Sequence, residues 1–312
     1  MDTQTTSTTA AAPKGQRRIA NIYSAFQTLG KPVFSFEIFP PKGDLTQEQA
    51  ADVGGQLAQL YPDFISVTFS AGGSGSHGRA ADATVSVAQL LQDQFGVPAL
   101  AHLTCANTTR EHLDAVCEDM KARGIENVLA LRGDLREDSE LHEFRLAVDL
   151  IAYLKDKGFC VGAAAYPEGH IDCADPRANI DHLKSKQDAG ADFFVTQLFF
   201  QNSYAYAFLD EARARGVTLP ISFGVMPFMS KSQVQRMVFM CGASLPSPIV
   251  KILAHYENDP VALEQAGVEY ACRQLVDLAA HGVDGLHVYT MNRPAVARAV
   301  KQELDAASLV RG

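Results

Sequence analysis

The chain has 312 residues, of which 47% are hydrophobic and 20% are charged, and its formal net charge is −9. This composition is typical of a soluble globular protein, and an acidic chain without a basic cluster is a poor candidate for binding nucleic acid. No apolar run approaches the roughly 18 residues that a membrane span requires.

The N-terminal segment, residues 1–15, is rich in Thr and Ala and has no apolar core. We expect a frayed, disordered tail rather than a secretory signal, with a transit peptide as an alternative because Arg17 and Arg18 follow. Residues 16–308 contain no Pro, Gly or Ser linker, which predicts one domain. The six cysteines include no C-x-x-C pair, so we expect reduced thiols, a cytoplasmic protein and no metal site.

A glycine followed by a short apolar run recurs six times along the chain. Glycine just past a helix end supplies the left-handed cap that stops the helix, and runs that are apolar on both faces suit parallel strands covered by helices. The six glycines are Gly96, Gly124, Gly158, Gly190, Gly216 and Gly282. With two earlier runs, the predicted strands are residues 33–36, 64–68, 97–103, 128–131, 159–165, 193–196, 219–223 and 286–289.

Apolar residues at three- and four-residue spacing predict helices between these strands. The predicted helices are residues 47–60, 80–95, 110–123, 145–157 and 178–189. Helix starts are indicated by Thr108 with Glu111, and by Asp175 and Asp259, each followed by proline. Residues 240–282 exceed one repeat and predict an extra helical segment before the last strand. The alternation predicts an α/β fold, a closed (β/α)8 barrel of TIM type, with a doubly wound open sheet as the main alternative.

Polar residues gather immediately after the predicted strands. They lie at residues 37–41, 68–72, 102–104, 132–134, 166–170, 197 and 289–293. Because barrel enzymes form their sites at the carboxyl ends of the strands, this convergence predicts an enzyme. Residues 73–78 also match G-x-G-x-x-G, but no clear acidic residue ends a strand about 20 residues on, so we prefer a glycine loop to a dinucleotide fingerprint.

The strand ends together resemble the signatures of the methylenetetrahydrofolate reductases. The matching segments are FSFEIFPPK (34–42), SVT (66–68), AHLTC (101–105), LALRGD (129–134), AAYPE (164–168), DAGAD (188–192), TQLFF (196–200) and YTMNR (289–293). The resemblance covers about residues 31–300, in the order of the family. The chain is similar to the short bacterial-type enzymes, so we expect it to lack the C-terminal regulatory region of the eukaryotic members.

The resemblance implies an FAD-dependent reaction in two halves. NADH or NADPH reduces bound FAD and leaves, and methylenetetrahydrofolate then takes its place and becomes methyltetrahydrofolate, which supplies methyl groups for methionine synthesis. Glu37 matches the family's proton donor, and its apolar flanks predict a burial that keeps the acid form available. Asp134 matches a position near the flavin, where a negative charge would tune the flavin's potential and favour a cationic folate intermediate. The plainer alternatives are a structural Glu37 and an Arg132–Asp134 ion pair.

Further residues match binding positions of the family. The resemblance assigns to FAD Phe69, Ala71, His102, Arg132, Gly133, Asp134, Tyr166, His170, Asn179, His182 and Lys186. It assigns to the nicotinamide or the folate Thr68, Gln197, Gln233, Tyr289 and Arg293. The chain departs from the bacterial pattern at four places: Asn179 and His182 replace Asp and Asn, Leu146 replaces Tyr, and Met237 replaces an aromatic ring.

Two other functions remain as alternatives. A metal- or Schiff-base-dependent barrel aldolase would need a strand-end lysine or a cluster of metal ligands. A non-catalytic flavin- or folate-binding subunit would not need Glu37. The sequence does not decide between NADH and NADPH. Barrels of this kind often associate through outer helices, so a homo-oligomer stays open.

Overall fold

The computed structural model describes residues 17–40, 47–69, 77–133, 143–173 and 175–310. The strands are β1 Val33–Ile38, β2 Phe64–Val67, β3 Ala99–Thr104, β4 Asn127–Leu131, β5 Cys160–Ala165, β6 Phe193–Thr196, β7 Ile221–Val225 and β8 Gly285–Tyr289. The helices are α1 Ile19–Gln27, α2 Gln47–Ala58, α3 His77–Phe95, α4 Arg110–Ala122, α5 Ala147–Asp156, α6 Pro176–Asp188, α7 Asn202–Ala214, α8 Lys231–Cys241, α9 Ser247–His255, α10 Pro260–Ala280 and α11 Pro294–Ala306.

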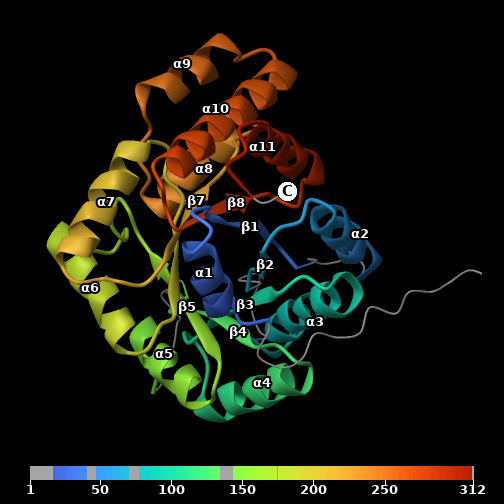
Figure 1. Cartoon of the computed structure of the whole chain (residues 1–312), viewed down its shortest axis with the longest axis vertical. Coiled ribbons are helices and arrows are strands. Elements are labelled where there is room, and N and C mark those ends of the chain that lie inside the picture. The colour runs from blue at the N-terminus through green and yellow to red at the C-terminus, as the bar shows by residue number, and fades with distance from the viewer. Residues whose placement is uncertain (1–16, 41–46, 70–76, 134–142, 174, 311–312) are drawn as a thin grey trace, which may run out of the picture.

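The eight strands form one closed parallel barrel in chain order, with β8 pairing back onto β1. Figure 1 looks along this barrel and shows the helices as a ring around it, with α1 across the near end. The register between β1 and β8 sets Ser35 beside His287 and Glu37 beside Tyr289. The predicted (β/α)8 barrel is therefore confirmed, and the open doubly wound sheet was the wrong alternative.

Local signals explain where the elements begin and end. All six predicted glycines have positive φ, between 68° and 104°, and each follows a helix. Asp175 and Asp259 cap α6 and α10 as predicted. The cap of α4 was predicted one residue too early, because the hydroxyl that accepts the His112 N–H belongs to Thr109. The predicted extra helical segment consists of α9, which precedes α10 before β8.

Alternate strand residues face two different cores. Outward residues such as Phe34, Phe36 and Ile38 pack against the surrounding helices. Inward residues such as Val33, Phe64 and Leu100 form a separate core with α1. This arrangement leaves the polar inward positions, among them Glu37 and His287, at the opposite end of the barrel from α1.

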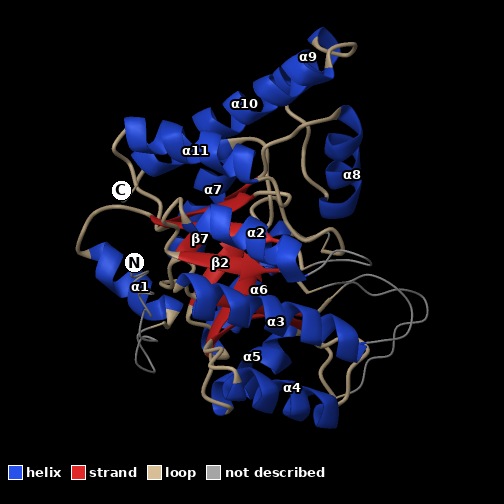
Figure 2. Cartoon of the chain, turned by 90° about the vertical axis from the view of Figure 1, so that its right-hand side faces the viewer, coloured by secondary structure: helices blue, strands red, loops and turns tan. Residues whose placement is uncertain are grey.

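Helix α1 closes the amino end of the barrel. Its buried side chains, Ile19, Tyr23 and Phe26, recur at intervals of four and three residues, a helical spacing that the sequence predictions did not include. The Tyr23 hydroxyl lies 2.7 Å from the Ser222 hydroxyl of β7. Figure 2 shows α1 and α8 on opposite sides of the barrel. No helix in the described ranges is long and apolar enough to cross a membrane.

Candidate active site

Glu37 lies inside the barrel between two histidines. It is 9% exposed, and its Oε2 is 3.4 Å from Nε2 of His287 on β8 and 3.6 Å from Nε2 of His102 on β3. Residues of β1 alternate inward and outward, so Ser35 and Glu37 face the same interior. The strand end thus presents a carboxyl group to two imidazoles, an arrangement that can hold and release a proton.

Each histidine is fixed by a serine on the neighbouring strand. The Ser35 hydroxyl is 2.8 Å from Nδ1 of His287, and the Ser66 hydroxyl is 2.7 Å from Nε2 of His102. Burial lowers the pKa of His102 to about 4, although the nearby Glu37 carboxylate opposes this shift. His102 is therefore neutral at pH 7 and acts toward its neighbours through hydrogen bonds rather than charge.

Tyr289, two residues after His287 on β8, reaches over β7 to β6. Its hydroxyl donates to the carbonyl oxygen of Thr196 on β6 at 2.6 Å, and its ring packs edge-on against the His287 ring. Gly224 of β7 makes room for this, because a Cβ there would lie 2.6 Å from the Tyr289 ring and 2.7 Å from the Thr196 oxygen. Burial raises the pKa of Tyr289 well above its ordinary value, and Glu37 adds to the effect.

A cavity of about 290 Å³ opens between the ends of β4 and β5 and helix α6. Six predicted cofactor residues line it together: Arg132, Tyr166, His170, Asn179, His182 and Lys186. Leu146 lines it as well, so this departure from the bacterial pattern lies in the same cavity. Residues separated by 54 positions in the sequence thus form one wall, as the convergence of strand ends predicts.

The cavity carries positive charge. The Arg132 guanidinium pairs with Asp172 at 2.8 Å, which lowers the pKa of that carboxyl. The Lys186 Nζ donates to the Ala164 carbonyl at 2.7 Å and lies 5.2 Å from the Tyr166 ring centre. Burial, followed by repulsion from Arg132, lowers the pKa of Lys186 to about 8. Two cations on one wall suit an anionic group such as a diphosphate.

Backbone and amide contacts shape this cavity further. The Asn179 side chain donates to the Tyr166 carbonyl at 2.8 Å, which ties α6 to the end of β5. Gly133 has φ 86°, and a Cβ there would lie 3.2 Å from the Thr104 side chain. Only a residue without a side chain fits this close turn between the ends of β3 and β4 without displacing its neighbours.

The predicted substrate residues occupy separate elements around the mouth. Thr68 follows β2 and is half-buried, while Gln197 follows β6 and accepts the Leu198 N–H at 2.9 Å. Gln233 lies on α8 and accepts the Met229 N–H at 2.8 Å. Arg293 precedes α11 and pairs with Glu264 at 2.5 Å, so in this structure its charge is directed to α10.

Of the predicted residues that the structure describes, Phe69 and Met237 do not join either group. Phe69 packs against the outer core. Met237 packs in a small core under α8 and α9 with Val234 and Leu253. Asp134 and Ala71 lie outside the described residues, as do residues 73–76 of the glycine loop.

We call Glu37 and the residues around it the axial cluster: Ser35, Glu37, Ser66, His102, His287 and Tyr289. Three of them were missed by the sequence predictions: Ser35, Ser66 and His287. The predictions considered the residues that follow each strand, whereas these three lie within strands. A usable signal was present, because Ser35 precedes Glu37 by two residues and His287 precedes Tyr289 by two. Polar residues two apart in a buried strand face the same side.

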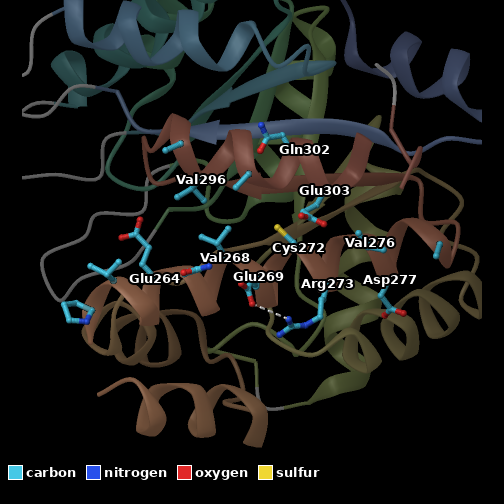
Figure 3. Close-up of a pocket in the computed structure, with 16 residues that line it drawn as sticks. Glu264, Val268, Glu269, Cys272, Arg273, Val276, Asp277, Val296, Gln302 and Glu303 are labelled. Atoms are coloured by element: carbon cyan, nitrogen blue, oxygen red, sulfur yellow. Dashed lines mark ion pairs between the residues drawn. The ribbon is translucent and has the colours of Figure 1, made fainter. Parts of the chain in front are cut away.

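A second hollow, of about 1250 Å³, lies outside the helix ring (Figure 3). All its lining residues belong to α10 or α11. Val268, Cys272 and Val296 line it with charged neighbours, and Arg273 lies 4.0 Å from Glu269. No strand end contributes to it, so it is separate from the two groups at the barrel mouth.

Comparison with known proteins gives a consistent result. The family model described as methylenetetrahydrofolate reductase matches residues 21–305. A 5,10-methylenetetrahydrofolate reductase of Pectobacterium carotovorum subsp. carotovorum is 32% identical over 286 residues, which cover 91% of this chain and 94% of the relative. Methylenetetrahydrofolate reductase 1 of Schizosaccharomyces pombe is 34% identical over 291 residues, covering 90% of this chain and 46% of the relative. The chain spans about half the length of the fungal and plant relatives that it matches.

A solved structure shares the fold. An uncharacterized protein from Clostridium thermocellum, which binds two copies of 5-methyl-5,6,7,8-tetrahydrofolic acid, superposes with a TM-score of 0.60 at 14% identity. The match covers 93% of this chain and 99% of that protein. At this identity the likeness concerns the barrel alone.

Proposed function

Because this chain belongs to the methylenetetrahydrofolate reductase family, we propose that it reduces 5,10-methylenetetrahydrofolate to 5-methyltetrahydrofolate in the cytoplasm. NADH or NADPH would be the reductant and FAD the bound cofactor, in a ping-pong sequence that supplies methyl groups for methionine synthesis. The observation that carries the proposal is Glu37, a buried carboxyl group held between His102 and His287 in a barrel that also has a cationic cavity at the ends of β4 and β5.

The residues of the cavity fit FAD. Arg132 and Lys186 offer cations for its diphosphate, and Tyr166, Asn179 and His182 offer an aromatic face and polar groups. A volume of about 290 Å³ is at the low end of small-molecule sites, so the cavity would hold one end of the dinucleotide. FAD supplies hydride transfer when bound.

The chain itself would supply the proton. Opening the five-membered ring of the folate to a reactive iminium requires a proton on the substrate amine, and Glu37 would donate it. The Glu37 O–H bond breaks as the N–H bond forms, which leaves a carboxylate. Asp134 would favour the resulting cation electrostatically. Gln197 can donate to and accept from a pterin edge, with Thr68, Gln233, Tyr289 and Arg293 as further substrate contacts.

The test separates the two half-reactions. Purified protein should carry the visible absorbance of FAD, anaerobic NADH or NADPH should bleach it, and methylenetetrahydrofolate should restore it. Glu37→Gln should keep the bleaching and slow the folate step by about 10²–10⁴-fold. Glu143→Gln, which alters an exposed pair with Arg110, serves as the control and should change neither step. If Glu37→Gln leaves both half-reactions intact, Glu37 is not the acid.

The alternatives give different results in the same experiment. A non-catalytic flavin- or folate-binding subunit would be bleached without reoxidation by folate, or would bind no FAD. A metal-dependent aldolase would need a ligand cluster, and the described part of the chain contains no group of three His, Cys, Asp or Glu side chains suited to hold a metal. Colourless protein that takes up no FAD would refute the proposal.

A further inference from the structure

The segment that carries Arg293 is fixed to the strand that carries Glu37. The Thr290 hydroxyl donates to the Glu37 carbonyl at 2.7 Å. The Asn292 side chain accepts from the Phe39 N–H at 2.8 Å and donates to the Phe39 carbonyl at 3.0 Å. Three hydrogen bonds therefore hold the end of β8 against the end of β1, and Arg293 is the next residue along the chain.

The backbone between these contacts and Arg293 turns sharply. Met291 and Asn292 have φ of 54° and 55°, a left-handed conformation that is uncommon outside glycine and persists where the surroundings hold it. The two bonds between Asn292 and Phe39 supply that support. The place of the Arg293 backbone at the barrel mouth thus depends on β1 and β8 rather than on the partner of its side chain.

The partner of the Arg293 side chain is Glu264 on α10. Nη2 of Arg293 lies 2.5 Å from Oε1 of Glu264, and the two side chains are 45% and 36% exposed. Water reaches both groups, so the pair is of the exposed kind that can exchange partners at low cost. Glu264 also lines the outer hollow between α10 and α11 (Figure 3). A carboxylate of this chain therefore occupies the guanidinium at the barrel mouth.

A substrate carboxylate would meet the same guanidinium. In the proposed function Arg293 contacts the folate, which ends in a glutamate with two carboxylates. To reach Arg293, this acidic tail must either displace Glu264 or lie beside it. Displacement breaks the existing ion pair, whereas coexistence places negative charges next to one another. In both cases the charge of Glu264 weakens the binding of the tail.

We propose that Glu264 competes with the acidic tail of the folate for Arg293 and so acts as a specificity-determining residue that limits the affinity for tailed substrates. This inference rests on the proposed function, in which Arg293 is a substrate contact. Glu264 acts at the tail and not at the reacting atoms. It should therefore change the concentration of folate needed for the reaction and leave the rate at saturation unchanged.

The test is a charge series at position 264. Glu264→Gln removes the charge, and Glu264→Lys reverses it. Exposed ion pairs change an equilibrium by at most about 5-fold. In the folate half-reaction of the reduced holoprotein, we expect the half-saturating concentration of methylenetetrahydrofolate to fall by about 2- to 5-fold in Glu264→Gln and at least as far in Glu264→Lys. The limiting rate should equal that of the wild type.

A second readout does not depend on turnover. Calorimetry measures the binding of 5-methyltetrahydrofolate to the oxidised holoprotein, and its dissociation constant should fall by the same factor in Glu264→Gln. An analogue in which methylamine replaces the glutamate has no acidic tail, so its dissociation constant should be equal in the wild type and both variants. Added salt should reduce the difference for the tailed ligand, because it screens exposed charges.

Two further variants serve as controls. Glu269→Gln neutralises another exposed carboxylate of α10, which pairs with Arg273 at 4.0 Å, and should change neither constant. Arg293→Gln removes the contested cation, and in this background Glu264→Gln should no longer tighten the binding of the tailed ligand. Tighter binding in Glu269→Gln as well would show a general effect of charge and would overturn the inference.

Failure of the inference can be told apart from failure of the proposed function. A wild-type protein that neither reduces nor binds folate refutes the proposed function. An active wild type whose Glu264→Gln variant binds the tailed ligand equally or more weakly overturns the inference alone, because Glu264 would then be neutral or would hold Arg293 ready for the tail. Equal tightening of the methylamide analogue would also overturn it, since the effect would not involve the tail.

Discussion

The barrel mouth contains two polar regions built on opposite principles. The cavity beside β4, β5 and α6 carries Arg132 and Lys186, with Asp172 as an exposed counter-charge. The axial cluster around Glu37 is buried, and its two histidines contact serine hydroxyls as well as the Glu37 carboxyl group. Cations at a solvated edge can hold an anion, whereas a buried carboxyl group beside imidazoles can give or take a proton. In the proposed function, the fold therefore separates the binding of FAD from the donation of the proton.

Gly224→Ala should have the largest effect and should damage only the axial region. The added Cβ would meet the Tyr289 ring at 2.6 Å and the Thr196 oxygen at 2.7 Å. Overpacking of this kind costs about 1–3 kcal/mol of unfolding free energy. We expect a lower melting temperature and a slower folate step, with the dissociation constant of FAD nearly unchanged. An equal loss of FAD binding would show that the two regions are not separable.

Arg132→Met should damage only the cavity. It removes a cation and leaves Asp172 without its partner. Loss of a hydrogen bond to a charged group costs about 1.5–3 kcal/mol, which corresponds to roughly 10–100-fold weaker FAD binding. Titration of the apoprotein with FAD, followed by flavin fluorescence, measures this constant. Once the variant is saturated with FAD, the pH at which its folate step reaches half of the maximal rate should equal that of the wild type. A different pH would show that the cavity and the axial cluster do not act independently.

The charge of Lys186 should make FAD binding depend on pH. Its pKa is lowered to about 8, so the ammonium is present below that pH and is lost above it. An anionic diphosphate binds the ammonium form better, so the dissociation constant should rise above pH 8, at most about 10-fold per unit. Lys186→Met should bind more weakly at pH 7 and show a flatter dependence. If the dissociation constant of FAD varies with pH in the same way in the wild type and in Lys186→Met, the pH dependence comes from another group.

Arg273→Ala should have the smallest effect. It removes an exposed pair with Glu269 in the outer hollow between α10 and α11. Exposed ion pairs contribute at most about 1 kcal/mol. We expect the melting temperature, the FAD dissociation constant and both half-reactions to stay within error of the wild type. A clear change in either half-reaction would extend the functional surface beyond the barrel mouth.

The sequence predicted the barrel well because its signals are local and repeated. Each of the six glycines follows a helix, and every predicted strand overlaps an observed one. It also predicted the members of the cavity, since strand ends of a barrel converge whatever their separation in sequence. It did not predict α1, which is a helix of nine residues, nor that Ser35 and His287 lie beside Glu37. Ser35 and His287 are distant in sequence and meet only because β8 closes onto β1.

The closure of the barrel by α1 has a consequence for turnover. With the Tyr23 hydroxyl against Ser222, the amino end of the barrel is sealed by packed side chains. Molecules that reach Glu37 must therefore enter and leave by the same opening. In the proposed reaction, spent nicotinamide would have to depart before folate could approach, so the architecture itself would impose alternation between the two substrates.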